Sequence, residues 1–468
     1  MAAEPRSVLF DRKESGIYHC YNRCVRRASL CGVDHLTGKS YSHRKDWIAD
    51  RLAYLARGFA IDVLDFCAMD NHLHLLLRNR PDLVELWNDR EVAERWIHLC
   101  PSELEKLEKQ QARRLAAGLV SATAIADVRE HYLKTMMNDQ AEMTALRGRL
   151  SDISWLMKLL CENIARQANR EDEVTGKFWE SRFQSDRILD EANALACSMY
   201  INLNPVRAQI AVAPEECSHT SLGIRMVTVR EMLLSVFGPE ALHTTADDQA
   251  EMIDQADVRE AANRLLAESS EDCAGAPEQI ESPCEEPAVL DCEDTAPLSE
   301  ETATAADSDS TNVNQPSRRP AGRQRARKGS ARLSDAWLSR LSLLGDQTMA
   351  GVSAARAMAM ANTFPAPRAS NKGFLPITLA DYLRLIDWTG RQAVKGKRGK
   401  IPDDLAPIAQ RLRIDLSSWP ELVGSFGQKG RTARGSFEAM EREAARRGRK
   451  WIRGKRLSPR AAATSVDV

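Results

Sequence analysis

The chain has 468 residues, 43% of them hydrophobic, and a formal net charge of −1 at pH 7, which is typical of a globular protein with two or three domains. No apolar run approaches the ~20 residues that a membrane-spanning helix needs, so composition excludes an integral membrane protein of that kind. Eleven scattered cysteines indicate reduced thiols, and the N-terminal MAAEPR lacks the layout of a secretion signal. We therefore expect a cytoplasmic protein.

The first elements along the chain are a strand and a helix. Residues 15–27 carry aromatic and β-branched side chains after Gly16, which favours a strand that runs into a basic turn. Residues 42–57 place Trp47, Ile48, Leu52 and Leu55 at helical spacing, with basic side chains on the other face.

Two further strands are predicted between residues 59 and 78, with a turn near Asp70 and Asn71. The second of them contains His72 and His74. Because side chains alternate between the faces of a strand, these two histidines point the same way and Leu73 points the other way. Two imidazoles on one face form half of a divalent-metal site.

Helices dominate the next stretch. Residues 82–150 are charged and helical in pattern and carry no chemistry that we can identify. Residues 151–169 form a clearer helix, for which Ser151 is the expected cap. Residues 176–188 are strand-like and rich in aromatic and arginine side chains, and a last helix at residues 189–204 ends before Pro205.

Composition divides the remainder of the chain. Residues 226–266 read as a helical extension and residues 267–333 as a disordered linker, because residues 268–310 hold 14 acidic side chains and no basic ones. A basic run follows at residues 318–328. Residues 334–468 regain apolar spacing and form a mainly helical, basic domain, since residues 331–468 contain 25 Lys and Arg against 12 Asp and Glu. Such an excess favours DNA as a partner.

Tyr200 and Asn204 share one helical face in the string YINLNPVRA at residues 200–208. A phenol, with a reference pKa of about 10, attacks a phosphodiester only where the charge that develops on the phosphate is stabilised. A divalent cation on His72 and His74 would do this, with Asn204 as a third ligand. Attack gives a covalent phosphotyrosine, so rejoining the strand needs no ATP.

These motifs resemble those of the IS200-type single-tyrosine transposases of the HUH endonuclease superfamily, and above all the REP-associated tyrosine transposases. Further matching strings are GIYH at residues 16–19, YNR at 21–23, SWLM at 154–157 and WESRF at 179–183. The resemblance covers about residues 10–225. It implies an α+β fold, a ferredoxin-like antiparallel sheet with helices, and a homodimer that acts on hairpin-bearing single-stranded DNA.

Carried over by residue, the resemblance makes His72 and His74 ligands of Mg²⁺ or Mn²⁺, Tyr200 the nucleophile and Asn204 a third metal ligand. Arg23, Arg182, Arg187 and Arg207 are the expected DNA contacts. The chain departs from compact family members by the helical insertion at about residues 82–150, by the acidic linker and by the basic C-terminal domain.

Other interpretations of the same residues are open. Tyr18, Tyr21 and Tyr132 are rival nucleophiles, though none combines an amide four residues later with the string that follows Tyr200. Cys20, Cys24, Cys31 and His35 imitate a zinc knuckle, but their spacing is irregular for structural zinc.

The main hypothesis from the sequence is a metal-dependent single-strand DNA endonuclease and strand transferase that works through a 5'-phosphotyrosine. A non-catalytic DNA-binding protein on the same fold is the first alternative, and for it His72→Ala would leave both DNA binding and the biological effect unchanged. A replication or conjugation nickase of the HUH type is the second, although the chain has no adjacent second tyrosine and no helicase motif.

Overall fold

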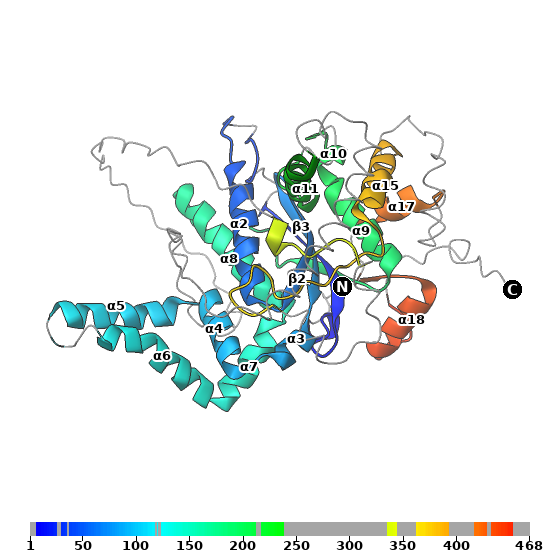
Figure 1. Cartoon of the computed structure of the whole chain (residues 1–468). Coiled ribbons are helices and arrows are strands. Elements are labelled where there is room, and N and C mark those ends of the chain that lie inside the picture. Colours follow the sequence, from blue (N-terminus) through cyan, green and yellow to red (C-terminus); the bar gives the residue numbers. More distant parts are fainter. Residues whose placement is uncertain are drawn as a thin grey trace, which may run out of the picture.

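A computed structural model describes residues 6–25, 30–34, 37–117, 119, 123–211, 217–237, 335–343, 362–392, 416–427 and 432–452. These residues form an α+β structure in which helices pack on both faces of a mixed five-stranded sheet (Figure 1). None of the described helices is long and apolar enough to cross a membrane.

The strands lie in the order β2-β3-β1-β4-β5. β1 lies between β3 and β4 and is antiparallel to both, β2 is antiparallel to β3, and the short β5 is parallel to β4. The bounds are β1 Gly16–Arg23, β2 Ile61–Ala68, β3 His72–Asn79, β4 Gln184–Ile188 and β5 Ala433–Arg434.

Two long helices, α2 (His43–Gly58) and α8 (Ile153–Glu171), cover one face of the sheet. Many strand residues that point to this face are apolar, and they share a core with the apolar stripes of both helices. That core includes Tyr18, Phe66, Leu75 and Leu77 from the strands and Leu52, Leu55, Leu156 and Leu160 from the helices. Apolar packing therefore fills much of this face.

The segment between β3 and α8 is helical throughout its described part. It comprises α3 Pro81–Leu86, α4 Asp89–Leu99, α5 Ser102–Ala116, α6 Thr123–Asn138 and α7 Gln140–Leu150. Figure 1 shows α5 and α6 projecting together away from the sheet. Buried side chains of this segment join the core of the first face, so the insertion extends that core without reaching the second face.

The second face of the sheet packs against α9 (Glu191–Asn202), which continues into the short α10 (Asn204–Arg207). Leu64 and Leu76 point from the strands into this second core, where they meet α9. α11 (Ser221–Phe237) lies beside α9 and β2 and is held by Asn202, whose side-chain oxygen accepts the backbone N–H of Leu222 at 3.0 Å.

The described C-terminal residues return to the sheet, most of them to this second face and Trp337 to the core of the first face. Their elements are the short 3₁₀ helices η5 Asp335–Trp337 and η6 Ser425–Gly427 and the helices α15 Leu379–Gln392, α17 Trp419–Gly424 and α18 Phe437–Arg446. The hydroxyl of Tyr382 on α15 is 2.8 Å from that of Ser198 on α9 and accepts from the Asn202 amide at 3.1 Å. Polar and apolar contacts thus join α9 to a segment about 180 residues further along the chain.

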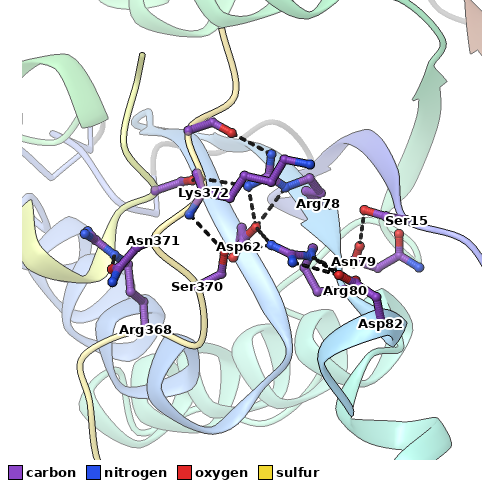
Figure 2. A network of polar contacts seen from close by, with 12 residues as sticks. Ser15, Asp62, Arg78, Asn79, Arg80, Asp82, Arg368, Ser370, Asn371 and Lys372 are labelled. Atoms are coloured by element: carbon purple, nitrogen blue, oxygen red, sulfur yellow. Dashed lines mark hydrogen bonds and ion pairs between the residues drawn. The ribbon is translucent and has the colours of Figure 1, made fainter. Parts of the chain in front are cut away.

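A polar network ties residues 368–373 to the ends of β2 and β3 (Figure 2). The buried Asp62 accepts from Arg78 at 2.6 Å and pairs with Arg80 at 3.4 Å. Arg78 also donates to the backbone oxygens of Lys372 and Gly373 at 2.9 and 2.7 Å. Both arginines therefore depend on the C-terminal segment for part of their hydrogen bonding.

Most predicted elements are present with shifted ends. The strand-like stretch 176–188 pairs as β4 only over its last five residues. The cap of α8 is Asp152, not Ser151, because the Asp152 carboxylate accepts the N–H of Ser154 at 2.7 Å. The predicted linker at residues 267–333 and the basic run at residues 318–328 lie outside the described residues, as does the part of the predicted extension after residue 237.

Candidate active site

β3 turns His72 and His74 toward α9, while Leu73 and Leu75 point into the opposite core. The two imidazole rings are 5.0 Å apart, centre to centre, and nearly perpendicular. The alternation of side chains along a strand explains this arrangement, as the His-Leu-His pattern predicts.

Tyr200 on α9 faces these histidines. Its ring centre is 5.4 Å from that of His74, and the two rings meet edge to face. Only 8% of Tyr200 is exposed. The chain therefore brings a phenol to within contact distance of an imidazole that lies 126 positions earlier in the sequence.

Asn204 opens α10 and completes the group. Its amide donates to the backbone oxygen of Tyr200 at 3.0 Å, as an i to i+4 pair permits. Its side chain also hydrogen-bonds those of His72 and Tyr200. One amide thus connects a predicted metal ligand to the predicted nucleophile.

Burial controls the charge of these groups. Burial and the charge of the nearby Arg23 together lower the pKa of His72 to about 4, and burial holds the pKa of His74 well below its usual range. Both imidazoles are therefore neutral at pH 7 and have a lone pair for a cation. Burial raises the pKa of Tyr200, against the hydrogen bond to Asn204 and the charge of Arg207, so the phenol keeps its proton in the resting site.

The donor set fits a divalent cation that keeps part of its coordination shell open. Two neutral imidazole nitrogens and the Asn204 amide oxygen are available, and neutral imidazole is a common metal ligand. Among the described residues, no group of three or more His, Cys, Asp or Glu side chains is placed to hold a metal. A cation here would therefore rely on the two histidines and the amide, with water and a phosphate oxygen in its other positions.

The predicted DNA-contacting arginines lie in different surroundings. Arg207 lies over the Tyr200 ring at 5.4 Å, and Arg23 is the cross-strand partner of His72. Arg182 is exposed just before β4. Arg187 is more enclosed, because it is 8% exposed and its guanidinium pairs with Glu443 at 3.3 Å and with Asp11 at 3.7 Å.

One rival nucleophile also lies at the site. Tyr21, the cross-strand partner of His74, has its ring centre 5.9 Å from that imidazole and donates to Gln184 at 3.1 Å. Tyr18 is buried in the opposite core and accepts from the backbone N–H of Asp11. Tyr132 lies on α6, in the insertion. Tyr21 is thus the rival nucleophile that an experiment has to distinguish from Tyr200.

The cysteines of the possible zinc knuckle have other partners. Cys24 and Cys31 hydrogen-bond each other, and Cys20 donates to the Ser185 hydroxyl at 3.4 Å. His35 lies outside the described residues. Cys20, Cys24 and Cys31 form no disulfide in the part of the chain that the structure describes.

Two residues of the site were not predicted. His19 on β1 lies against His74, with 5.1 Å between their ring centres, and Phe426 of η6 lies 6.0 Å from both His19 and Tyr200. His19 belongs to the GIYH string, and a correct β1–β3 register would have placed it on the histidine face. No signal in the sequence links Phe426 to this site, because its approach depends on how the C-terminal segment folds back.

Similarity to known proteins does not identify the chain. No protein-family model, curated protein or solved structure matches it. The resemblance to single-tyrosine transposases therefore rests on the sequence motifs, and a function has to be argued from the site itself.

Proposed function

We propose that this protein is a metal-dependent endonuclease and strand transferase for single-stranded DNA, with Tyr200 as its nucleophile. The observation that carries the proposal is the convergence of Tyr200, His72, His74 and Asn204 on one face of the sheet. The strand order β4-β1-β3-β2, with α2 and α8 as the connecting helices, supports a ferredoxin-like HUH domain.

The reaction is a transesterification. The Tyr200 hydroxyl oxygen attacks the scissile phosphorus, the bond from phosphorus to the 3' oxygen breaks, and the departing oxygen takes up a proton to become a 3' hydroxyl. The DNA 5' end remains on Tyr200 as a phosphotyrosine. The reverse reaction, with a 3' hydroxyl as nucleophile, rejoins a strand without an external energy source.

Each side chain has a role in that step. His72, His74 and Asn204 would hold Mg²⁺ or Mn²⁺, which polarises a non-bridging phosphate oxygen when bound. The hydrogen bond from Asn204 orients the Tyr200 phenol, and it opposes the rise in the pKa of the phenol that burial causes. The positive charge of Arg207 favours the phenolate, and it is near enough to attract the scissile phosphate.

Other parts of the proposal concern the partner. The basic excess of the C-terminal residues favours additional phosphate contacts, and exposed Arg182 and half-buried Arg23 are candidates nearer the site. The family resemblance adds hairpin-bearing single strands as substrates and a homodimer as the active form.

A covalent-adduct assay tests the nucleophile. Purified protein is incubated with hairpin-bearing single strands labelled at the 3' end and Mn²⁺, and adducts are separated under denaturing conditions. Wild type and Tyr21→Phe should form the adduct, while Tyr200→Phe should form none, because the attacking oxygen is missing. Tyr21→Phe is the matched control, since it removes a hydroxyl from the same site.

Adduct formation by Tyr200→Phe would contradict the assignment, and its loss in Tyr21→Phe alone would transfer the role to Tyr21. Binding of these strands by wild type without any adduct would favour a non-catalytic DNA-binding protein. His72→Ala gives a second distinction between an enzyme and a DNA-binding protein. In the enzyme it should abolish cleavage and leave DNA binding in place.

A further inference from the structure

A third histidine lies behind the predicted metal ligands. His19 on β1 is completely buried, and its Nε2 is 3.0 Å from Nδ1 of His74. The two rings are nearly parallel, at 19°. Burial keeps both imidazoles neutral at pH 7. In a hydrogen bond between neutral imidazoles one ring donates and the other accepts, so this contact fixes which nitrogen of His74 carries the proton.

Only one of the two arrangements lets His74 bind a cation. Its Nδ1 is occupied by His19, which leaves Nε2 as the nitrogen for a ligand. Nε2 has a free lone pair only if Nδ1 carries the proton and donates to Nε2 of His19. His19 must then carry its own proton on Nδ1. In the opposite arrangement Nε2 of His74 is protonated and cannot coordinate a metal.

The neighbouring strand carries a carboxylate on the face from which His19 projects. Asp186 on β4 is the direct cross-strand partner of His19, and such partners project from the same face of the sheet. Asp186 is 1% exposed. In the described part of the chain, Nδ1 of His19 is buried and has no hydrogen-bond partner. Asp186 is not hydrogen-bonded to this nitrogen, so it acts on the ring through its charge, which favours the tautomer with the proton on Nδ1.

The C-terminal segment fixes the carboxylate. Arg434 on β5 donates from Nε to Asp186 at 2.8 Å, and both side chains are almost completely buried. The same guanidinium donates to the backbone oxygen of Ser425 at 3.1 Å and lies over the Phe426 ring at 4.2 Å. An ionised Asp186 is therefore held beside β1 by a residue from the far end of the chain.

We propose that Arg434, Asp186 and His19 form a positioning relay that selects the His74 tautomer able to bind metal through Nε2. Carboxylates that orient metal-bound histidines in this way raise metal affinity, and their loss typically costs 10–100-fold. Here one imidazole stands between the carboxylate and the ligand. The proposal deepens the function proposed above and rests on it for the role of the cation, but the tautomer is a property of the metal-free protein.

The tautomer is measured first, on the full chain labelled with ¹⁵N-histidine and freed of metal by EDTA. Long-range proton–nitrogen correlation spectra, assigned by comparison with His74→Gln, should show His74 protonated on Nδ1. Asp186→Asn should shift it toward the Nε2 form, because the neutral amide lacks the negative charge that favours a proton on Nδ1 of His19. The matched control is Asp65→Asn, which alters a buried carboxylate that pairs with Arg225 at 2.7 Å outside the histidine group.

Mn²⁺ affinity is measured next by electron paramagnetic resonance titration of the same proteins. Asp186→Asn should bind about 10–100-fold more weakly than wild type, whereas Asp65→Asn should bind like wild type. A folded Asp186→Asn variant with unchanged affinity would overturn the relay. So would a wild-type His74 protonated on Nε2, a reading that decides the question even if Asp186→Asn does not fold.

The two proposals fail in different ways. If wild type binds no Mn²⁺ but shows the Nδ1 tautomer that Asp186→Asn loses, the relay stands and the metal-dependent reaction is wrong. If Mn²⁺ binds and Asp186 has no effect on affinity or tautomer, the metal site stands and the relay is wrong.

Discussion

His19 and His74 are buried imidazoles, and burial penalises their charged forms. The pKa of His19 falls to about 3, and that of His74 is also well below the usual value of about 6.5. The unfolded chain therefore binds more protons than the folded chain as the pH falls below about 6.5. Stability is fully present above that pH and is lost progressively toward the folded-state pKa values.

At pH 5.5 each of these histidines should reduce the free energy of unfolding by about 1 kcal/mol relative to pH 7.5. Urea unfolding at both pH values, with EDTA present, measures the loss. His72, whose pKa is about 4, contributes a similar loss, so His19→Gln should remove only its own contribution of about 1 kcal/mol, whereas His131→Gln, which changes an exposed side chain on α6, should remove none. Equal free energies of unfolding at the two pH values in wild type would contradict the buried, neutral state of these rings.

At the scale of elements, the sequence predicts what is local. The His-Leu-His alternation places His72 and His74 on one face, and the spacing from Tyr200 to Asn204 brings Asn204, at the start of α10, back to Tyr200 on α9. Contacts between elements could not be predicted from the sequence. The pairing of His19 with His74 requires the β1–β3 register, and the burial of Arg187 depends on Glu443, which is 256 positions away. Side-chain packing between distant segments decides such details, and no local pattern encodes it.

The N-terminus of α8 allows a direct test of one local error. Asp152 accepts the N–H of Ser154, whereas Ser151, one residue earlier, was the expected cap. Asp152→Ala should lower the free energy of unfolding by about 1 kcal/mol, because a helix N–H loses its acceptor. Ser151→Ala is the matched control and should cost less. Urea titrations of both variants give the comparison. A larger loss of unfolding free energy for Ser151→Ala would show that Ser151 is the cap, as the sequence predicts.

At the scale of the whole molecule, the C-terminal residues belong to the same cores as the sheet. Trp337 and Leu338 lie in the core of the first face, and Tyr382, Trp419 and Phe426 lie in that of the second. Arg446 of α18 also pairs with Asp11 near the N-terminus at 3.1 Å. The basic region predicted to be a DNA-binding domain therefore also covers α9, which carries Tyr200, and its division from the first domain remains a prediction from composition.

This packing predicts that residues 1–237 are not stable alone. The fragment would lose five large buried side chains from the second core, namely Tyr382, Ile386, Trp388, Trp419 and Phe426. At roughly 2 kcal/mol each, their burial is comparable with the whole stability of a typical domain, about 5–15 kcal/mol. Arg78 would also lose its acceptors at Lys372 and Gly373.

Thermal unfolding followed by circular dichroism should show no cooperative transition for the fragment, and co-expression with residues 335–468 should restore one. A fragment that melts cooperatively at the temperature of the full chain would instead establish an independent first domain, with the C-terminal region docked on it but dispensable for its folding.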